Sequence, residues 1–151
     1  MSPMAILLAT DGSPEARAAA EWLDRWVQPA AAHITLVTVI TPPSFSWTIG
    51  PDGYVLDAAG FAQTYHDLLA EEEAAARAAL AATAQELAHC PPVATEILLG
   101  HPAAAIVTYA QTHRQDLIVM GRRGHSALGN LMGSVSFAVL HRSPIPVTIV
   151  S

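Results

Sequence analysis

Lysine is absent from this sequence of 151 residues, and all seven basic residues are arginine. Without lysine, the chain has no Schiff-base nucleophile and no lysine for a phosphate-binding loop of the GxxxxGK type. Charged residues make up 13% of the sequence, and the formal net charge is −6. A nucleic-acid-binding surface needs clustered cations, so we expect no nucleic-acid partner.

Cysteine is almost absent as well. Cys90 is the single cysteine, which excludes a disulfide within the chain and is typical of a reducing compartment. The first residues have no basic segment of a secretory signal, and the apolar run that follows stops at Asp11. No run approaches the roughly 18 apolar residues of a membrane span. We therefore expect a cytoplasmic protein with no membrane contact.

Apolar runs alternate along the chain with segments typical of helices. The first helix has clear start signals, because Ser13 can cap it, Pro14 fits its first position and Glu15 is an early acid. Strands are predicted at residues 4–9, 34–40, 93–99, 117–120 and 145–150, and helices at residues 14–27, 60–89, 102–113 and 134–141. Strands joined by helical crossovers form a parallel sheet covered on both faces. We therefore expect one doubly wound α/β domain over residues 1–151.

The expected order of this five-stranded parallel sheet is 3-2-1-4-5. In such sheets, ligands bind beyond the carboxyl ends of the strands, where the strand order reverses. That crevice would lie between the first and fourth strands and would bring Asp11 opposite Met120 and Gly121. Asp11 could hold a ribose hydroxyl or a metal ion on a nucleotide; alternatively, it is a turn residue that starts the first helix.

Residues 41–58 interrupt the alternation of strands and helices. The segment contains three prolines, two glycines and three aromatic residues, with the periodicity of neither a strand nor a helix. Loops of this length in compact domains are usually lids, binding segments or linkers. The sequence favours equally a flexible flap and a surface that packs on a partner.

Two glycine segments surround the predicted crevice. Gly121-Arg122-Arg123-Gly124 follows the fourth predicted strand, and Gly133-Ser134-Val135-Ser136 opens the last predicted helix. Glycine lets backbone N–H groups approach a phosphate closely, and a helix N-terminus adds unpaired donors and a positive dipole. Either serine could donate a hydroxyl hydrogen, and the two arginines offer charge where no lysine exists. On spacing alone, simple turn and helix-cap geometry is an alternative explanation of the glycines.

Four segments together resemble the universal stress protein family over nearly the whole chain. They are Ala9-Thr10-Asp11-Gly12-Ser13, Asp116-Leu117-Ile118-Val119-Met120-Gly121, the glycine motif just described, and Arg142-Ser143-Pro144-Ile145-Pro146-Val147. The resemblance implies an ATP site; a magnesium ion bound with the nucleotide would lie near Asp11 under the ligand-binding alternative given above for that residue. It also implies a homodimer formed through the last strand, and the free apolar edge predicted at residues 145–150 indicates the same pairing.

The resemblance further assigns residues to parts of the nucleotide. It implies that Ala9, Thr10, Asp11 and Val39 contact adenine and ribose, that Met120 and Gly121 line the nucleoside, and that Gly124, Gly133, Ser134 and Val135 contact the phosphates. The favoured function is a stress-response regulatory protein that binds ATP with little or no hydrolysis, because no general base stands out to activate water. The alternative is a dimeric interaction module of the same fold that binds no nucleotide.

One interval departs from the family's ATP-binding members. They have nine residues between the second and third glycines of the motif, whereas this chain has eight, residues 125–132. Loss of one residue rotates the rest of a helical turn by about 100°. We therefore expect adenosine recognition to survive and γ-phosphate contacts to weaken, so that ATP and ADP bind within about tenfold, or about 1.4 kcal/mol.

Overall fold

The structure is a computed structural model that describes residues 2–42, 58–123 and 132–151. Most of the 41–58 segment, Gly124 and residues 125–131 lie outside the described residues. The predictions made for them therefore stay predictions.

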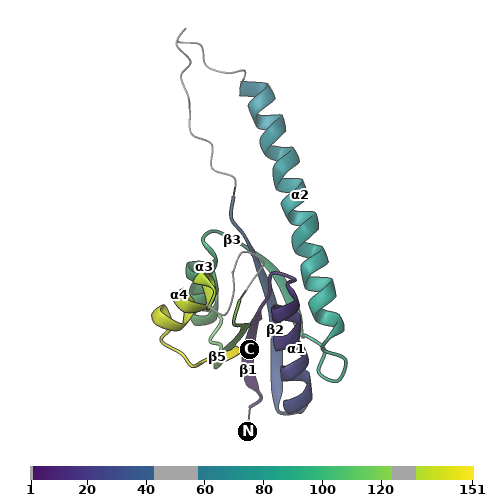
Figure 1. Cartoon of the computed structure of the whole chain (residues 1–151), viewed down its shortest axis with the longest axis vertical. Helices are drawn as coiled ribbons and strands as arrows, with labels where there is room; N and C mark the ends of the chain where they lie inside the picture. The colour runs from purple at the N-terminus through teal and green to yellow at the C-terminus, as the bar shows by residue number, and fades with distance from the viewer. Residues whose placement is uncertain (1, 43–57, 124–131) are drawn as a thin grey trace.

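Strands and helices alternate along the described chain (Figure 1). The strands are β1 Met4–Ala9, β2 Ala32–Ile40, β3 Ala94–Leu99, β4 Leu117–Gly121 and β5 Val147–Val150, and the helices are α1 Pro14–Trp26, α2 Ala58–Gln85, α3 Pro102–Thr112 and α4 Ser134–Arg142. All five strands pair in parallel, in the order β3-β2-β1-β4-β5. The predicted fold class and strand order are confirmed.

The end of α2 differs from the prediction for a physical reason. The helix ends at Gln85 rather than near residue 89. Beyond it, the carboxylate of Asp24 on α1 accepts hydrogen bonds from the backbone amides of His89 and Cys90, both at 2.8 Å. These bonds replace the helical bonds that the two amides would otherwise make, so the chain turns toward β3. Strand β5 also begins two residues late, because the prolines before it have no amide hydrogen to donate.

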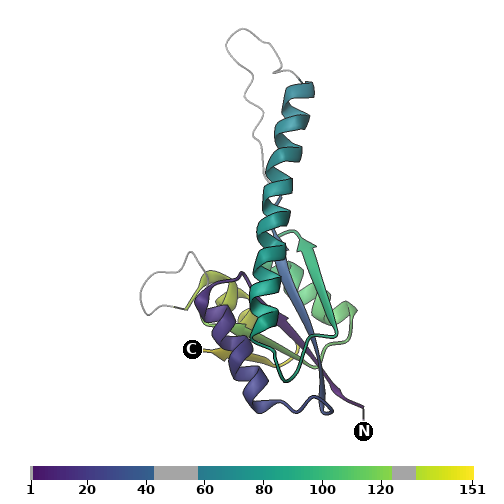
Figure 2. The same cartoon turned by 90° about the vertical axis from the view of Figure 1, so that its right-hand side faces the viewer.

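The side chains of the central strand divide between two cores. Ile6 and Leu8 of β1 pack with α1 and α2, whereas Leu7 and Ala9 pack with α3 and α4. Successive side chains of a strand point to opposite faces of the sheet, so both faces of β1 are buried and its sequence is continuously apolar. Figure 2 shows α1 and α2 together on one face of the sheet.

A short chain of hydrogen bonds fixes the end of β1 on α2. Thr83 Oγ1 donates to the carbonyl oxygen of Ala79 at 2.8 Å. Since a hydroxyl has one hydrogen, Thr10 is the donor in the 2.7 Å bond between the two threonine hydroxyls. The Gly12 amide in turn donates to Thr10 Oγ1 at 3.0 Å. Gly12 has a φ of +79°, and a Cβ there would lie 2.9 Å from the Ala79 Cβ, so the position requires glycine.

The end of β4 lies against the first turn of α1. A Cβ at Gly121 would lie 2.8 Å from the carbonyl carbon and oxygen of Glu15 and 3.0 Å from the amide nitrogen of Ala16. These are backbone atoms, which cannot rotate aside as a flexible side chain can. Ser13 holds the same turn, because its Oγ accepts a hydrogen bond from the Ala16 amide at 3.2 Å, and the predicted N-cap is confirmed. The glycine therefore sets the distance between β4 and α1.

We expect Gly121→Ala to lower the free energy of unfolding by about 1–3 kcal/mol, the usual cost of overpacking a tightly packed position. Urea denaturation measures this loss. Gly133→Ala is the matched control, because the nearest atom to a Cβ there lies at 3.3 Å, and its loss should be clearly smaller. Equal losses in the two variants would contradict the role given to Gly121.

Candidate functional site

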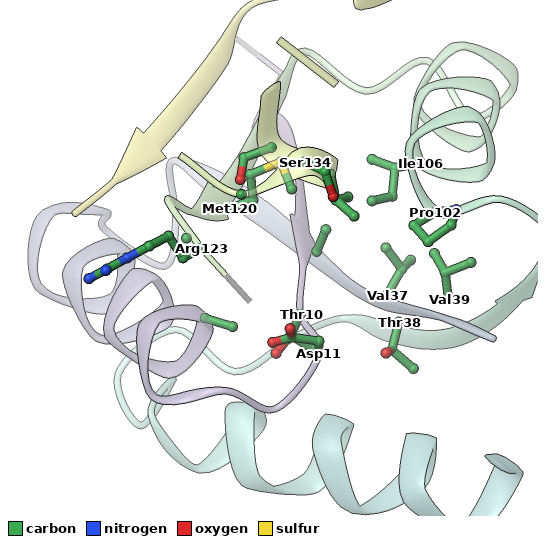
Figure 3. A pocket seen from close by; sticks show the side chains of 16 residues that line it. Thr10, Asp11, Val37, Thr38, Val39, Pro102, Ile106, Met120, Arg123 and Ser134 are labelled. Atoms are coloured by element: carbon green, nitrogen blue, oxygen red, sulfur yellow. The ribbon is translucent and has the colours of Figure 1, made fainter. Parts of the chain in front are cut away.

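A cavity of about 220 Å³ lies where the carboxyl ends of β1, β2 and β4 meet the first turns of three helices (Figure 3). It is at the predicted position, because β1 and β4 are neighbours and their crossovers run to opposite faces of the sheet. The described lining residues are Ala9, Thr10, Asp11, Ala16, Val37, Thr38, Val39, Pro102, Ile106, Met120, Gly121, Arg123, Gly133, Ser134, Val135 and Ser136.

The cavity brings together most of the residues singled out from the sequence. Those lining it are Ala9, Thr10, Asp11, Val39, Met120, Gly121, Arg123, Gly133, Ser134, Val135 and Ser136. Arg122 is described but is not a lining residue. Its backbone ties the neighbouring segments together, because its amide donates to Val150 and its carbonyl accepts from the Gly133 amide, both at 2.9 Å. Gly124 lies outside the described residues.

Five lining residues were missed by sequence reasoning, namely Ala16, Val37, Thr38, Pro102 and Ile106. A signal for Val37 was available: it lies two residues before Val39 on β2, so both side chains point to the same face. Pro102 and Ile106 are four residues apart and share one face of α3. Their place in the cavity depends on how α3 packs on the sheet, which no local pattern encodes.

One wall of the cavity is apolar. Val37 and Val39 come from β2, Ile106 from α3 and Met120 from β4. Figure 3 shows Val37, Val39 and Ile106 on the right of the view and Met120 on its left. Val37, Ile106 and Met120 are buried members of the core on the α3 and α4 face. Such a wall excludes water and suits a flat, weakly polar group.

The N-terminus of α4 forms a polar part of the cavity. Gly133 is its N-cap and has no side chain that could accept a hydrogen bond from the amides of the first turn. These amides and the helix dipole together favour a negatively charged group. The exposed Ser134 can add its hydroxyl, whereas the buried Ser136 donates its hydroxyl hydrogen to the Arg122 carbonyl at 2.6 Å. Of the two serines, Ser136 therefore holds the loop rather than offering a donor to a ligand.

Asp11 starts the first helix and also lines the cavity. Its Oδ1 accepts a hydrogen bond from the Ser13 amide at 2.9 Å, which is the turn contact expected of an aspartate just before a helix. The residue is exposed at the rim. The two alternatives from the sequence are thus compatible, since a turn contact through Oδ1 fixes the direction of the carboxylate.

Arg123 lines the cavity, but its charge is already paired. Its Nη2 lies 2.6 Å from Glu15 Oε1 on α1, and Figure 3 shows the side chain extending away from Thr10, Asp11 and Ser134. The sequence predicted that this arginine offers its charge to a phosphate. In the structure, its guanidinium forms an ion pair with the Glu15 carboxylate; contact with a phosphate stays a prediction.

A separate cluster of titratable groups lies around Asp24, outside the described lining of the cavity. Burial raises the pKa of the Cys90 thiol, and the neighbouring Asp24 carboxylate raises it further. The thiol is 3% exposed, so it is protonated and inaccessible rather than nucleophilic. Burial also acts to raise the pKa of Asp24, but hydrogen bonds from the His89 ring and from the Cys90 and His89 amides outweigh it and lower that pKa.

The described part of the chain offers neither a metal-ligand cluster nor a membrane-spanning helix. It contains no group of three or more histidine, cysteine, aspartate or glutamate side chains placed to hold a metal ion. None of its helices combines the length and the apolar character needed to cross a bilayer.

A second hollow, of about 420 Å³, lies on the other side of α3. Leu98, Leu99 and His101 line it from the end of β3, and Thr108 and Tyr109 line it from α3. None of these residues lines the main cavity, so a ligand in one hollow would not contact the described lining of the other.

Sequence comparison decides the family. The model of the universal stress protein family matches residues 4–151. This chain belongs to the universal stress protein family. A universal stress protein of Thermus aquaticus is 34% identical over 146 residues, or 96% of each chain. One from Mycolicibacterium smegmatis is 32% identical over 96% of this chain but 47% of its own length, so this chain spans about half of that relative.

Solved universal stress proteins have the same fold. UspA of Lactobacillus plantarum is 26% identical, with a TM-score of 0.79 over the full length of both chains. A universal stress protein in complex with cAMP has a TM-score of 0.57 at 24% identity, over 100% of this chain and 98% of its own. One from Archaeoglobus fulgidus in complex with dAMP has a TM-score of 0.59 at 18% identity, over the full length of both. The predicted family and fold are therefore confirmed.

Proposed function

We propose that this chain is a cytoplasmic stress-response regulator that binds adenine nucleotides, ATP among them, with little or no hydrolysis. The observation that carries the proposal is the pairing of an apolar wall with an uncapped helix N-terminus in one cavity. A nucleotide has the same two parts, an aromatic base and a phosphate group. Its base would lie against Val37, Val39 and Met120, and its phosphates would accept hydrogen bonds from the α4 amides and Ser134.

The carboxylate of Asp11 at the rim supports the same orientation of the nucleotide. Asp11 lies exposed at the rim of the same cavity and would accept a hydrogen bond from a ribose hydroxyl. The same carboxylate could coordinate a magnesium ion that is bound to the phosphates. The solved relatives bound to cAMP and dAMP support an adenine nucleotide as the ligand class.

Little or no hydrolysis is expected from the cavity's composition. Among its described lining residues, Asp11 is the one carboxylate, and histidine is not represented. Hydrolysis of ATP requires a group that positions water and charge that compensates the γ-phosphate. Because the Asp11 carboxylate would be engaged by the ribose or magnesium and Arg123 is paired with Glu15, neither requirement is met by these side chains.

Calorimetric titration with adenosine, AMP, ADP and ATP, each with magnesium, tests the ligand class. We expect binding of all four, with ATP and ADP within about tenfold of each other. Ser134→Asp places a carboxylate in the exposed first turn of α4, where it suits the helix dipole but repels phosphate. It should weaken ATP binding by at least about tenfold and adenosine binding far less.

Arg25→Gln is the control for that variant, because it makes the same change in net charge at an exposed pair with Glu21 outside the described lining of the cavity. Its nucleotide affinities should equal those of the native chain. Absence of any heat or thermal shift at millimolar ATP would exclude the nucleotide proposal and favour the interaction module.

We also propose that the protein is a homodimer paired through β5. This strand bonds to β4 on one side and ends the sheet. Pro146 and Val150 accept hydrogen bonds from the β4 side, so the alternating residues Val147 and Ile149 direct their backbone groups outward. Helix α4, which precedes β5 in the chain, has exposed Phe137 and Leu140 side chains. They add apolar surface that a partner could cover. An edge of this kind is usually paired or covered.

Light scattering at micromolar concentration should give twice the 15.9 kDa chain mass. Ile149→Pro removes one outward amide hydrogen and should shift the protein toward monomer, while Ile149→Val keeps that hydrogen and should leave the dimer intact. A monomeric native chain would refute the dimer, and a dimer unaffected by Ile149→Pro would place its interface elsewhere.

A further inference from the structure

The ion pair between Glu15 and Arg123 connects the two sides of the cavity mouth. A Cβ on Gly133 would lie 3.3 Å from the Arg123 Cα, so the arginine backbone lies beside the N-cap of α4. Its side chain then runs to Glu15 in the first turn of α1, with Nη2 and Oε1 2.6 Å apart. The backbone of Arg123 therefore lies next to the expected phosphate position, whereas its side chain extends away from that position (Figure 3).

The position of Glu15 is fixed by the fold. Its carbonyl group packs against Gly121 at a distance that no other residue permits, so the first turn of α1 cannot withdraw from the end of β4. The pair is also partly shielded from water, because the arginine and glutamate side chains are 28% and 30% exposed. Such shielding makes the pair stronger than a fully solvated one.

The pair leaves one donor of Arg123 unsatisfied. Its Nε is buried and has no hydrogen-bond partner among the described residues. A buried N–H without an acceptor is costly, and a guanidinium can present several donors to a phosphate at once. A phosphate oxygen near α4 would therefore be an alternative acceptor that competes with Glu15 for this side chain.

We propose that Glu15 sets the phosphate preference of the cavity by holding Arg123 away from the ligand, an inference that rests on the proposed nucleotide function. Arg123 is the one cation and Asp11 the one carboxylate among the described lining residues. Together with Glu15, which pairs with Arg123, these three side chains carry a net negative charge, and phosphates are held chiefly by the α4 amides. Each phosphate beyond the first therefore adds little to the binding free energy, and the native chain binds AMP and ATP with similar affinity.

Calorimetric titration of Glu15→Gln with adenosine, AMP and ATP tests this inference. Gln keeps the size of the side chain and removes its charge, so Arg123 becomes available to the phosphates. We expect ATP affinity to rise about fivefold, the upper range for a partly exposed ion pair, with AMP intermediate and adenosine changed less than twofold. The gain should shrink as salt concentration rises, and thermal melting checks that the variant is folded.

Two further variants separate a local effect from a general one. Glu86→Gln removes the same charge from the 2.8 Å pair with Arg17 on α1, outside the described lining of the cavity, and should leave the ratio of ATP to adenosine affinity unchanged. Glu15→Gln combined with Arg123→Gln should abolish the gain, because the released cation is gone.

The outcomes distinguish this inference from the function on which it rests. Native protein that binds adenosine, together with an unchanged affinity ratio in Glu15→Gln, overturns the role of Glu15 alone. An equal gain in Glu86→Gln, or a gain that persists without Arg123, also overturns it. Native protein that binds none of the three ligands overturns the proposed function and this inference together.

Discussion

The close approach of Gly121 to the first turn of α1 is the constraint on which the site depends. Because no side chain separates β4 from the Glu15 carbonyl, the helix N-terminus lies beside the strand end and narrows the crevice between β1 and β4. On the other side of that crevice, the Gly12 amide bonds to Thr10, and the Thr10 hydroxyl is linked through Thr83 to the Ala79 carbonyl. The shape of the cavity is thus set by contacts within the fold, before any ligand binds.

The electrostatics of the cavity follow from its arginine-only composition. A lysine could have presented a compact, mobile charge to a ligand, whereas a guanidinium tends to be held in planar contacts with carboxylates. Arg123 is held in this way by Glu15. The uncapped amides of α4 therefore provide the main attraction for an anion, and the field they create is fixed in direction. Binding at such a site depends on fit as well as on charge.

Much of this arrangement could be predicted from the sequence, because it is encoded locally. Ser13 and Pro14 mark the start of α1, and the continuous apolar run of β1 indicates a strand buried on both faces. The direction of long side chains could not be predicted. Arg123 pairs with Glu15, which is 108 residues away in sequence, and the α2 end depends on Asp24 of another helix. Such contacts depend on packing between elements that are distant in the sequence, and the hydrophobic periodicity of the sequence does not predict them.

Backbone amide chemical shifts in a titration with AMP test most directly whether this cavity is the ligand site. We expect the largest changes at Thr10, Val39, Gly133 and Ser134, with little change at Asp24 and His89. The largest changes at Leu99 and Tyr109, which line the second hollow beside α3, or no changes at saturating AMP, would contradict this expectation.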